Sequence, residues 1–237
     1  MEDLFKIIHE DDELLVINKP AGLACHPTKG DVYSSLISRV RLYLNGVGRP
    51  HLVNRLDRET SGVVLVAKND STALELRRIW ERRDVKKSYL AIVHGNIEED
   101  GVIDAPLGRD QESLVAIKDK VRADGARAST EYDVLRRFSR AEGDFSLLRV
   151  RPFTGRKHQI RIHLSHIGHP IVGDKLYGLD EGMYLDFVKG RLTHEQRKKL
   201  ILPHQALHAE EVEFQWRGEE SKFRAESEEW FTDFSGP

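Results

Sequence analysis

Short apolar segments separated by turn residues run through most of this sequence, and this spacing constrains the fold more than any other feature. Short runs that alternate or are wholly apolar predict strands, whereas apolar residues three or four positions apart predict helices. The predicted strands cover residues 5–8, 14–18, 63–67, 88–94, 127–138, 145–153, 212–216 and 222–226. The predicted helices cover residues 34–44, 69–83 and 156–167.

Many strands with few regular strand–helix alternations predict an α+β fold, with a mixed, mostly antiparallel central sheet and flanking helices. The chain shows no internal repeat and no low-complexity linker. Its 237 residues suffice for one large catalytic domain or two small ones. We therefore expect a single domain over residues 1–237.

Composition narrows the class of protein. The N-terminal segment has acidic residues early and no continuous apolar core, so it is not a signal peptide. No apolar run approaches the length of about 18 residues that a membrane span requires. The single cysteine, Cys25, can form neither an internal disulfide nor a multi-cysteine zinc site, and we interpret it as a small buried residue. A cytoplasmic protein is expected.

Charge is unevenly distributed along the chain. Residues 208–233 contain nine acidic and three basic residues, a net charge of −6, so the rest of the chain carries +4 against a total of −2. Such asymmetry permits a basic face for a nucleic-acid partner, although solvated surface charge is its commoner origin.

A polar, charge-dense loop, Asn54-Arg55-Leu56-Asp57-Arg58-Glu59-Thr60-Ser61-Gly62, leads directly into the apolar run 63–67. A loop that feeds a core strand holds its side chains at the rim of a rigid scaffold, where catalytic groups tend to lie. Asp57, between Arg55 and Arg58, is the candidate catalytic carboxylate. Taken alone, such a triplet is more often a surface ion pair.

A second polar segment begins with the turn Thr154-Gly155, and we expect it to continue as a helix whose first turn carries Arg156 and Lys157. Free N–H groups and cations at a helix N-terminus suit a phosphate. The cations oppose the helix dipole, and this local conflict favours an anionic ligand over a solvated helix end.

Four histidines, His158, His163, His166 and His169, raise the question of a metal site. His163 and His166 could share a helix face, but His158 is rotated away from them. No HExxH or HxH spacing is present, so we expect no metal.

These segments resemble the RluA branch of the pseudouridine synthases. The loop NRLDRETSG, residues 54–62, is similar to the family's HRLDxxTSG pattern, and GRKHQIRIHLSHIGHPIVGDKLYG, residues 155–178, is similar to its GRxHQIRxH and GHPIxGDxLYG patterns. Shorter matches are Asn18-Lys19-Pro20-Ala21-Gly22, Lys87-Ser88-Tyr89 and Leu207-His208-Ala209. The resemblance covers about residues 5–226, and Asn54 departs from the family's usual histidine. Because it begins near residue 5, we expect no extra N-terminal RNA-binding module.

The resemblance implies an RNA pseudouridine synthase that isomerises uridine in an rRNA or tRNA stem-loop after the base is flipped into the site. Asp57 would attack C1′ or the uracil ring, or stabilise the separated sugar, and these routes stay open. By resemblance Arg161 is its partner, and Tyr89 packs on the uracil, plain core packing being the alternative for Tyr89. The expected substrate-binding residues are Arg55, Thr60, Ser61, Gly62, Arg156, Lys157, His158 and Gln159.

The product of such a reaction is an isomer of its substrate, so no cofactor is needed, and the chain has no GxGxxG or Walker loop. We expect a monomer whose partner is RNA and not a membrane. The basic run Arg77, Arg78, Arg82, Arg83, Lys86 and Lys87 could hold the RNA backbone or be a solvated helix face. A nucleoside or glycoside hydrolase pairing Asp57 with a second acid such as Glu59, and an RNA-binding module without activity, are the rival functions.

Overall fold

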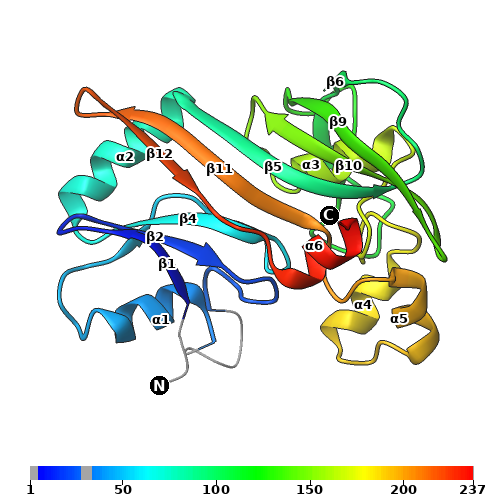
Figure 1. Ribbon diagram of the computed structural model, residues 1–237, viewed down its shortest axis with the longest axis horizontal. Coiled ribbons are helices and arrows are strands. Elements are labelled where there is room, and N and C mark those ends of the chain that lie inside the picture. Colours follow the sequence, from blue (N-terminus) through cyan, green and yellow to red (C-terminus); the bar gives the residue numbers. More distant parts are fainter. Residues whose placement is uncertain (1–4, 28–33, 237) are drawn as a thin grey trace. The chain divides into compact units, whose positions relative to one another are not determined.

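The computed structural model describes residues 5–27 and 34–236 (Figure 1). It divides into two compact units, the first comprising Met1–Ser88 with His208–Phe234 and the second comprising Tyr89–Leu207 with Ser235–Pro237. Both units combine strands with a few helices, which confirms the α+β prediction. The single domain predicted over residues 1–237 stays a prediction.

The first unit is built on a mixed sheet. Its elements are β1 (Lys6–Glu10), β2 (Leu14–Lys19), α1 (Leu36–Tyr43), β3 (His51–Leu52), β4 (Ser61–Ala67), α2 (Asp70–Arg82), the start of β5 (Val85–His94), β11 (Leu207–Trp216), β12 (Glu219–Arg224) and most of α6 (Glu229–Ser235). The strand order is β1-β2-β4-β11-β5, with β12 on β11 and β3 on β4. β4 and β11 are parallel, whereas β1–β2, β2–β4, β3–β4 and β11–β12 are antiparallel.

Strand β4 is the core of this unit, because each of its seven residues is buried. Its side chains Val63, Leu65 and Ala67 pack with Ala73 and Leu76 of α2 in one apolar cluster. Asn69 caps α2 by accepting a bond from the N–H of Thr72 at 2.9 Å. The predicted buried strand and the helix that follows it are both confirmed.

The second unit contains a long antiparallel hairpin and several short elements. Its elements are the rest of β5, β6 (Gly101–Asp104), β7 (Leu107–Arg109), β8 (Asp119–Val121), β9 (Ser129–Arg140), β10 (Gly143–Pro152), α3 (Gln159–His166), α4 (Gly182–Val188) and α5 (His194–Leu200). The strand order is β5-β10-β9-β6, and β7 and β8 form a separate ribbon. No helix among residues 5–27 and 34–236 is long and apolar enough to cross a membrane.

Helix α3 is shorter than predicted. It begins at Gln159, so Arg156 and Lys157 lie in the turn before it, and their predicted place in its first turn is wrong. His158 adopts a left-handed conformation, with φ of 55°, which separates the turn from the helix. Ile162, on the buried side of α3, packs with Leu107 and Tyr177 in the apolar cluster of this unit.

Candidate functional site

The loop that carries Asp57 is fixed to β4 at its first residue. The side-chain amide of Asn54 donates to the carbonyl of Val63 at 3.0 Å and accepts from the N–H of Leu65 at 2.8 Å. Both partners are backbone groups of the core strand. The residue that departs from the family pattern therefore positions the loop.

A second attachment lies one residue before Asp57. The thiol of Cys25 contacts the carbonyl of Leu56 at 3.3 Å and receives its N–H at 3.4 Å. Cys25 is buried, which confirms its interpretation as a small core residue, and burial is the main cause that raises the pKa of its thiol. Since Cys25 contacts both the carbonyl and the N–H of Leu56, it holds the loop against the segment after β2.

A buried ammonium ties the same loop to the turn after β2. Lys19, with 0% of its surface exposed, donates to the carbonyls of Pro20, Leu23 and Arg58 at 2.8, 2.9 and 3.2 Å. Burial lowers the pKa of Lys19 to about 8, and the negative charges around it, including that of Asp57, oppose this shift. Lys19 thus supplies three hydrogen bonds that join the turn after β2 to the Asp57 loop.

We expect Lys19→Met to destabilise the first unit by about 2–4 kcal/mol, because three carbonyls lose a buried donor. Its lowered pKa also predicts the pH dependence. The unfolded chain binds more protons between about pH 8 and the ordinary lysine pKa of 10.5, so this residue's contribution to stability rises with pH across that window. Urea unfolding of the wild type and of Lys19→Met from pH 7 to 10 measures this pH dependence. An equal pH slope in the two proteins would refute the assignment.

The end of the loop passes very close to β11. The hydroxyl of Ser61 lies 2.9 Å from Nδ1 of His208, whose Nε2 lies 3.1 Å from the carbonyl of Ala225. Gly62 has a φ of 114°, and a Cβ on it would lie 2.2 Å from the carbonyl oxygen of Ala209. Only glycine fits this crossing, so the predicted substrate residues Ser61 and Gly62 also have structural roles here.

Gly62→Ala should destabilise the protein by more than about 3 kcal/mol, since a backbone clash adds to the strain of a positive φ. Gly46→Ala is the matched control, because Gly46 also has a positive φ, 76°, but no atom lies within 4 Å of an added Cβ. Thermal unfolding of the two variants separates clash from strain. Equal losses of stability in both would show that the clash relaxes.

The predicted catalytic trio is divided between the units, with Asp57 in the first and Tyr89 and Arg161 in the second. Asp57 is partly buried, and its carbonyl accepts the N–H of Thr60 at 3.2 Å in a tight turn. Arg55 is exposed, and Thr60 is buried. Tyr89 is partly buried on β5 and pairs with Val150 of β10. A common site of the trio stays a prediction.

Arg161 is held in place by an acid that the sequence did not single out. Its Nε and Nη2 donate to the two carboxylate oxygens of Asp174 at 2.7 and 2.9 Å, and both residues are buried. The same carboxylate accepts the N–H groups of Leu176 and Tyr177. Burial opposes ionisation of Asp174, but the charge of Arg161 and these hydrogen bonds outweigh it and lower its pKa. The guanidinium therefore has one fixed direction.

The turn before α3 is closed by Gln159. Its side-chain oxygen accepts the hydroxyl of Thr154 at 2.6 Å and the N–H of Arg156 at 3.0 Å. Its nitrogen donates to Ser129 and Thr130 at 2.9 Å each. Its amide is thus occupied inside the protein and shapes the turn that displays Arg156, and direct RNA contact by Gln159 stays a prediction.

The cations of this turn differ in how they are held. Arg156 is exposed and donates from Nε to the carbonyl of Arg127 at 3.2 Å, whereas Lys157 makes an ion pair with Asp119 at 2.9 Å. Nδ1 of His158 lies 2.9 Å from the hydroxyl of Tyr177. In the part of the chain that the structure describes, no group of three or more His, Cys, Asp or Glu is arranged to hold a metal ion.

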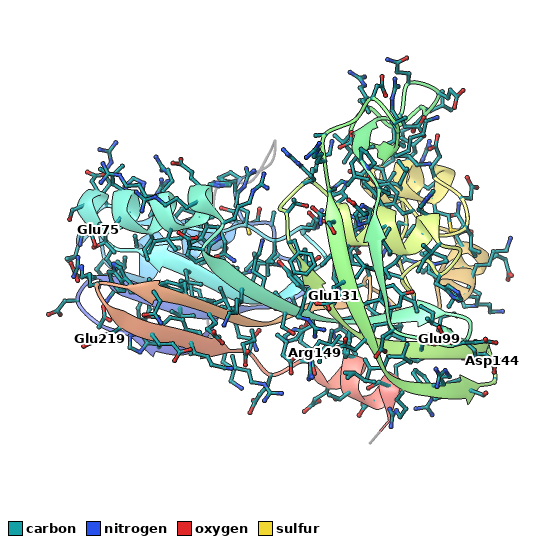
Figure 2. All side chains as sticks on the ribbon, turned by 90° about the horizontal axis from the view of Figure 1, so that it is seen from above. Glu75, Glu99, Glu131, Asp144, Arg149 and Glu219 are labelled. Atoms are coloured by element: carbon teal, nitrogen blue, oxygen red, sulfur yellow. The ribbon has the colours of Figure 1, made fainter. Side chains whose placement is uncertain are left out.

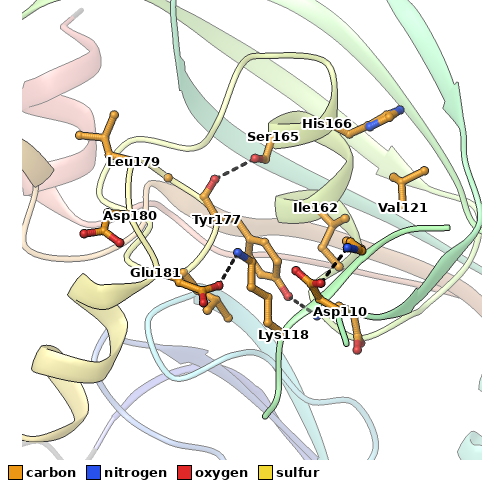
Figure 3. Close-up of a pocket in the computed structure, with 14 residues that line it drawn as sticks. Asp110, Lys118, Val121, Ile162, Ser165, His166, Tyr177, Leu179, Asp180 and Glu181 are labelled. Atoms are coloured by element: carbon orange, nitrogen blue, oxygen red, sulfur yellow. Dashed lines mark hydrogen bonds and ion pairs between the residues drawn. The ribbon is translucent and has the colours of Figure 1, made fainter. Parts of the chain in front are cut away.

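Tyr177 also borders a cavity of about 370 Å³ between the β7–β8 ribbon and the segment after α3 (Figure 3). Its ring lies 5.0 Å from the guanidinium of Arg161, and its hydroxyl accepts the N–H of Asp119 at 3.2 Å. In its lining, Lys118 and Glu181 form an ion pair at 2.7 Å. Tyr177 therefore lies in the wall of this cavity and also against Arg161.

The sequence of this chain is similar to those of known RNA-modifying proteins. The family model described as RNA pseudouridylate synthase matches residues 13–166. An uncharacterised RNA pseudouridine synthase of Bacillus subtilis is 41% identical over 179 residues, which are 73% of this chain and 57% of the relative. A ribosomal large subunit pseudouridine synthase D of Nitrosomonas europaea is 39% identical, over 88% of this chain and 57% of the relative. The chain thus spans just over half the length of these relatives.

Solved structures agree with the sequence relatives. The human RNA pseudouridylate synthase domain containing 1 superposes with a TM-score of 0.77 and 26% identity, covering 96% of this chain and 86% of the human chain. The human RNA pseudouridylate synthase domain containing 4 gives a TM-score of 0.70 and 29% identity, over 95% and 90% of the two chains.

Proposed function

The chain belongs to the RNA pseudouridylate synthase family, and on this premise we propose that it isomerises specific uridines of structured RNA to pseudouridine. The observation that carries the proposal is the rigid mounting of the Asp57 loop, by Asn54 and Lys19 on either side of Leu56. A loop held by hydrogen bonds before and after Asp57 presents its carboxylate with little freedom, as catalysis requires.

The proposed reaction breaks the bond between uracil N1 and C1′ of the ribose, turns the base, and joins uracil C5 to C1′. The proton on C5 is lost and N1 gains one, so atoms balance without a cofactor. Asp57 supplies the negative charge, either as a nucleophile at C1′ or on the ring, or as a stabiliser of the separated sugar. Within the first unit, the ammonium of Lys19 interacts favourably with that charge.

Arg161 and Tyr89 complete the proposed site. Asp174 orients the guanidinium of Arg161, which would favour the ionised form of Asp57 once a bound base excludes water. Tyr89 would pack against the uracil ring, and its hydroxyl would take part in removal of the C5 proton. The target base must leave its stack to enter the site, which costs a few kcal/mol and less in a loop.

The substrate is proposed to be an rRNA or tRNA stem-loop. The ribosomal large subunit synthases among the relatives support rRNA. Arg55 and Arg156 are exposed cations suited to the backbone of the bound RNA, and Lys157 would join them after leaving Asp119. We further propose that the protein acts as a monomer in the cytoplasm.

The decisive experiment incubates the protein with cellular RNA that contains 5-tritiated uridine, from a strain lacking the gene. Tritium release with retention of the base in the RNA is expected, followed by mapping of the modified position. Appearance of free uracil would instead identify the rival hydrolase. Stable RNA binding with no release from any RNA fraction would identify a binding module and overturn the proposal.

A further inference from the structure

Helix α2 exposes a row of arginines on the side opposite to its core contacts. Ala73 and Leu76 face the apolar cluster, whereas Arg77, Arg78 and Arg82 lie on the exposed face. Arg83, also exposed, follows directly as the left-handed residue that ends the helix. These four arginines are the α2 arginine face.

Two of the three carboxylates of α2 are engaged elsewhere, and the third, Glu81, is exposed beside Arg82. Asp70 contacts His51 at 2.6 Å, and Glu75 accepts Arg217 at 2.9 Å and the indole of Trp216 at 3.0 Å. Figure 2 labels Glu75 on this helix. The negative charge of Glu75 is also felt by Arg78. Asp70 and Glu75 thus attach α2 to other parts of its own unit.

Within residues 5–27 and 34–236, no carboxylate makes an ion pair with Arg77, Arg82 or Arg83. The helix dipole accounts for a cation in the last turn, at Arg82, but its effect does not extend to Arg77. Burial lowers the pKa of Lys87, and the charge of Arg83 lowers it further. Like charges gathered in this way favour an anionic partner.

The face lies well away from Asp57 along the sheet. β4 begins at Ser61, which pairs with His208 of β11. After α2 the chain enters β5, where Lys86 contacts Glu213, further along β11. At about 3.3 Å per residue, the interval from His208 to Glu213 corresponds to about 17 Å. An RNA that reaches both places must extend several nucleotides beyond the target.

We propose that the α2 arginine face binds the phosphodiester backbone of the substrate RNA, at a distance from the modified uridine. The inference rests on the proposed function and adds a second point of contact to it. Arg78 and Arg82 are separated by about 6 Å along the helix axis, which corresponds to about two nucleotides of a duplex strand. Guanidinium groups at this spacing suit phosphate oxygens and carry no base preference.

The test variant changes Arg77, Arg82 and Arg83 together to glutamine, which preserves helix propensity and side-chain length. The matched control changes three exposed cations of α5, Arg197, Lys198 and Lys199, to glutamine, giving the same net charge. The probe is a mixed-sequence RNA duplex of about 20 base pairs, and its affinity is measured from 50 to 300 mM KCl. Circular dichroism verifies that both variants fold.

We expect the α2 variant to reduce the slope of log affinity against log salt by about 2–3, because each lost phosphate contact removes close to one released counterion. The α5 variant should leave the slope unchanged. Equal slopes for the wild type and both variants would overturn the inference. It would also be overturned if the α2 variant lost binding to vesicles containing phosphatidylserine but kept its binding to RNA.

Turnover separates this inference from the proposed function. In single-turnover assays with the protein in saturating excess over cellular RNA, the α2 variant should release tritium within about twofold of the wild-type rate, since bound substrate meets an unchanged Asp57 loop. A reduced salt slope in a protein that never releases tritium would support the surface and reject the isomerase. Normal release with an unchanged slope would support the isomerase and reject the surface.

Discussion

Asp57→Asn is expected to abolish tritium release from 5-tritiated uridine, with a rate loss of at least about 10⁴-fold. An amide has the shape of the carboxylate but carries no negative charge, so it can neither act as the nucleophile nor stabilise a cationic sugar. The loop should keep its conformation, because Asn54, Cys25 and Lys19 attach it through backbone groups of other residues. Single-turnover tritium release and thermal unfolding measure the two effects separately.

Two further substitutions make this result specific. Asp84→Asn removes an exposed carboxylate elsewhere in the first unit and should leave the rate unchanged. Glu59→Gln tests the paired-carboxylate alternative, and we expect it to retain activity. Loss of activity in both Asp57→Asn and Glu59→Gln, with free uracil from the wild type, would favour a hydrolase. Normal release by Asp57→Asn would remove Asp57 from the mechanism altogether.

Asp174→Asn is expected to destabilise the protein by about 3–5 kcal/mol, because it leaves the buried guanidinium of Arg161 without its counter-charge. For a chain of this length such a loss lowers the unfolding temperature by about 6–20 °C. The exposed Asp180 provides the matched control, and Asp180→Asn should change the temperature little. Differential scanning calorimetry compares the two variants.

The lowered pKa of Asp174 adds a pH dependence with a defined sign. A carboxyl whose pKa is depressed by folding stabilises the protein above its unfolded pKa, and this stability is lost as pH falls through the folded pKa. Wild type should therefore lose this contribution in acid, whereas Asp174→Asn lacks it at every pH. Stability curves that stay parallel down to about pH 3 would contradict the ion pair as the origin of the effect.

Sequence patterns located the main elements because strong local signals agreed with the tertiary structure. The apolar run before Ala67 became the fully buried β4, and Asn69 caps α2 as its side chain predicts. Charge density next to that strand and the resemblance of residues 54–62 to the family pattern made the loop around Asp57 the candidate, and its catalytic role stays a prediction. The reason for Asn54 was hidden, because its partners are backbone groups of Val63 and Leu65, which carry no sequence signal.

The second unit was harder to predict. The ribbon β7–β8 and the helices α4 and α5 have only three or seven residues each, too few for a periodic pattern. The start of α3 was placed too early because a left-handed His158 interrupts an otherwise helical pattern. Asp174 lies thirteen residues from Arg161 and contacts it only in the folded chain, although the GDKLYG stretch, which resembles a family pattern, offered a signal.

The two bonds of Asn54 have a consequence for how the core can vary. Both bonds end on main-chain atoms of β4. The position of the loop therefore does not depend on which aliphatic side chains occupy that strand. Exchanges among valine, isoleucine and leucine along β4 can repack the interior while the carboxylate keeps its coordinates relative to the strand. The aliphatic side chains of the core can therefore change without moving the loop that carries Asp57.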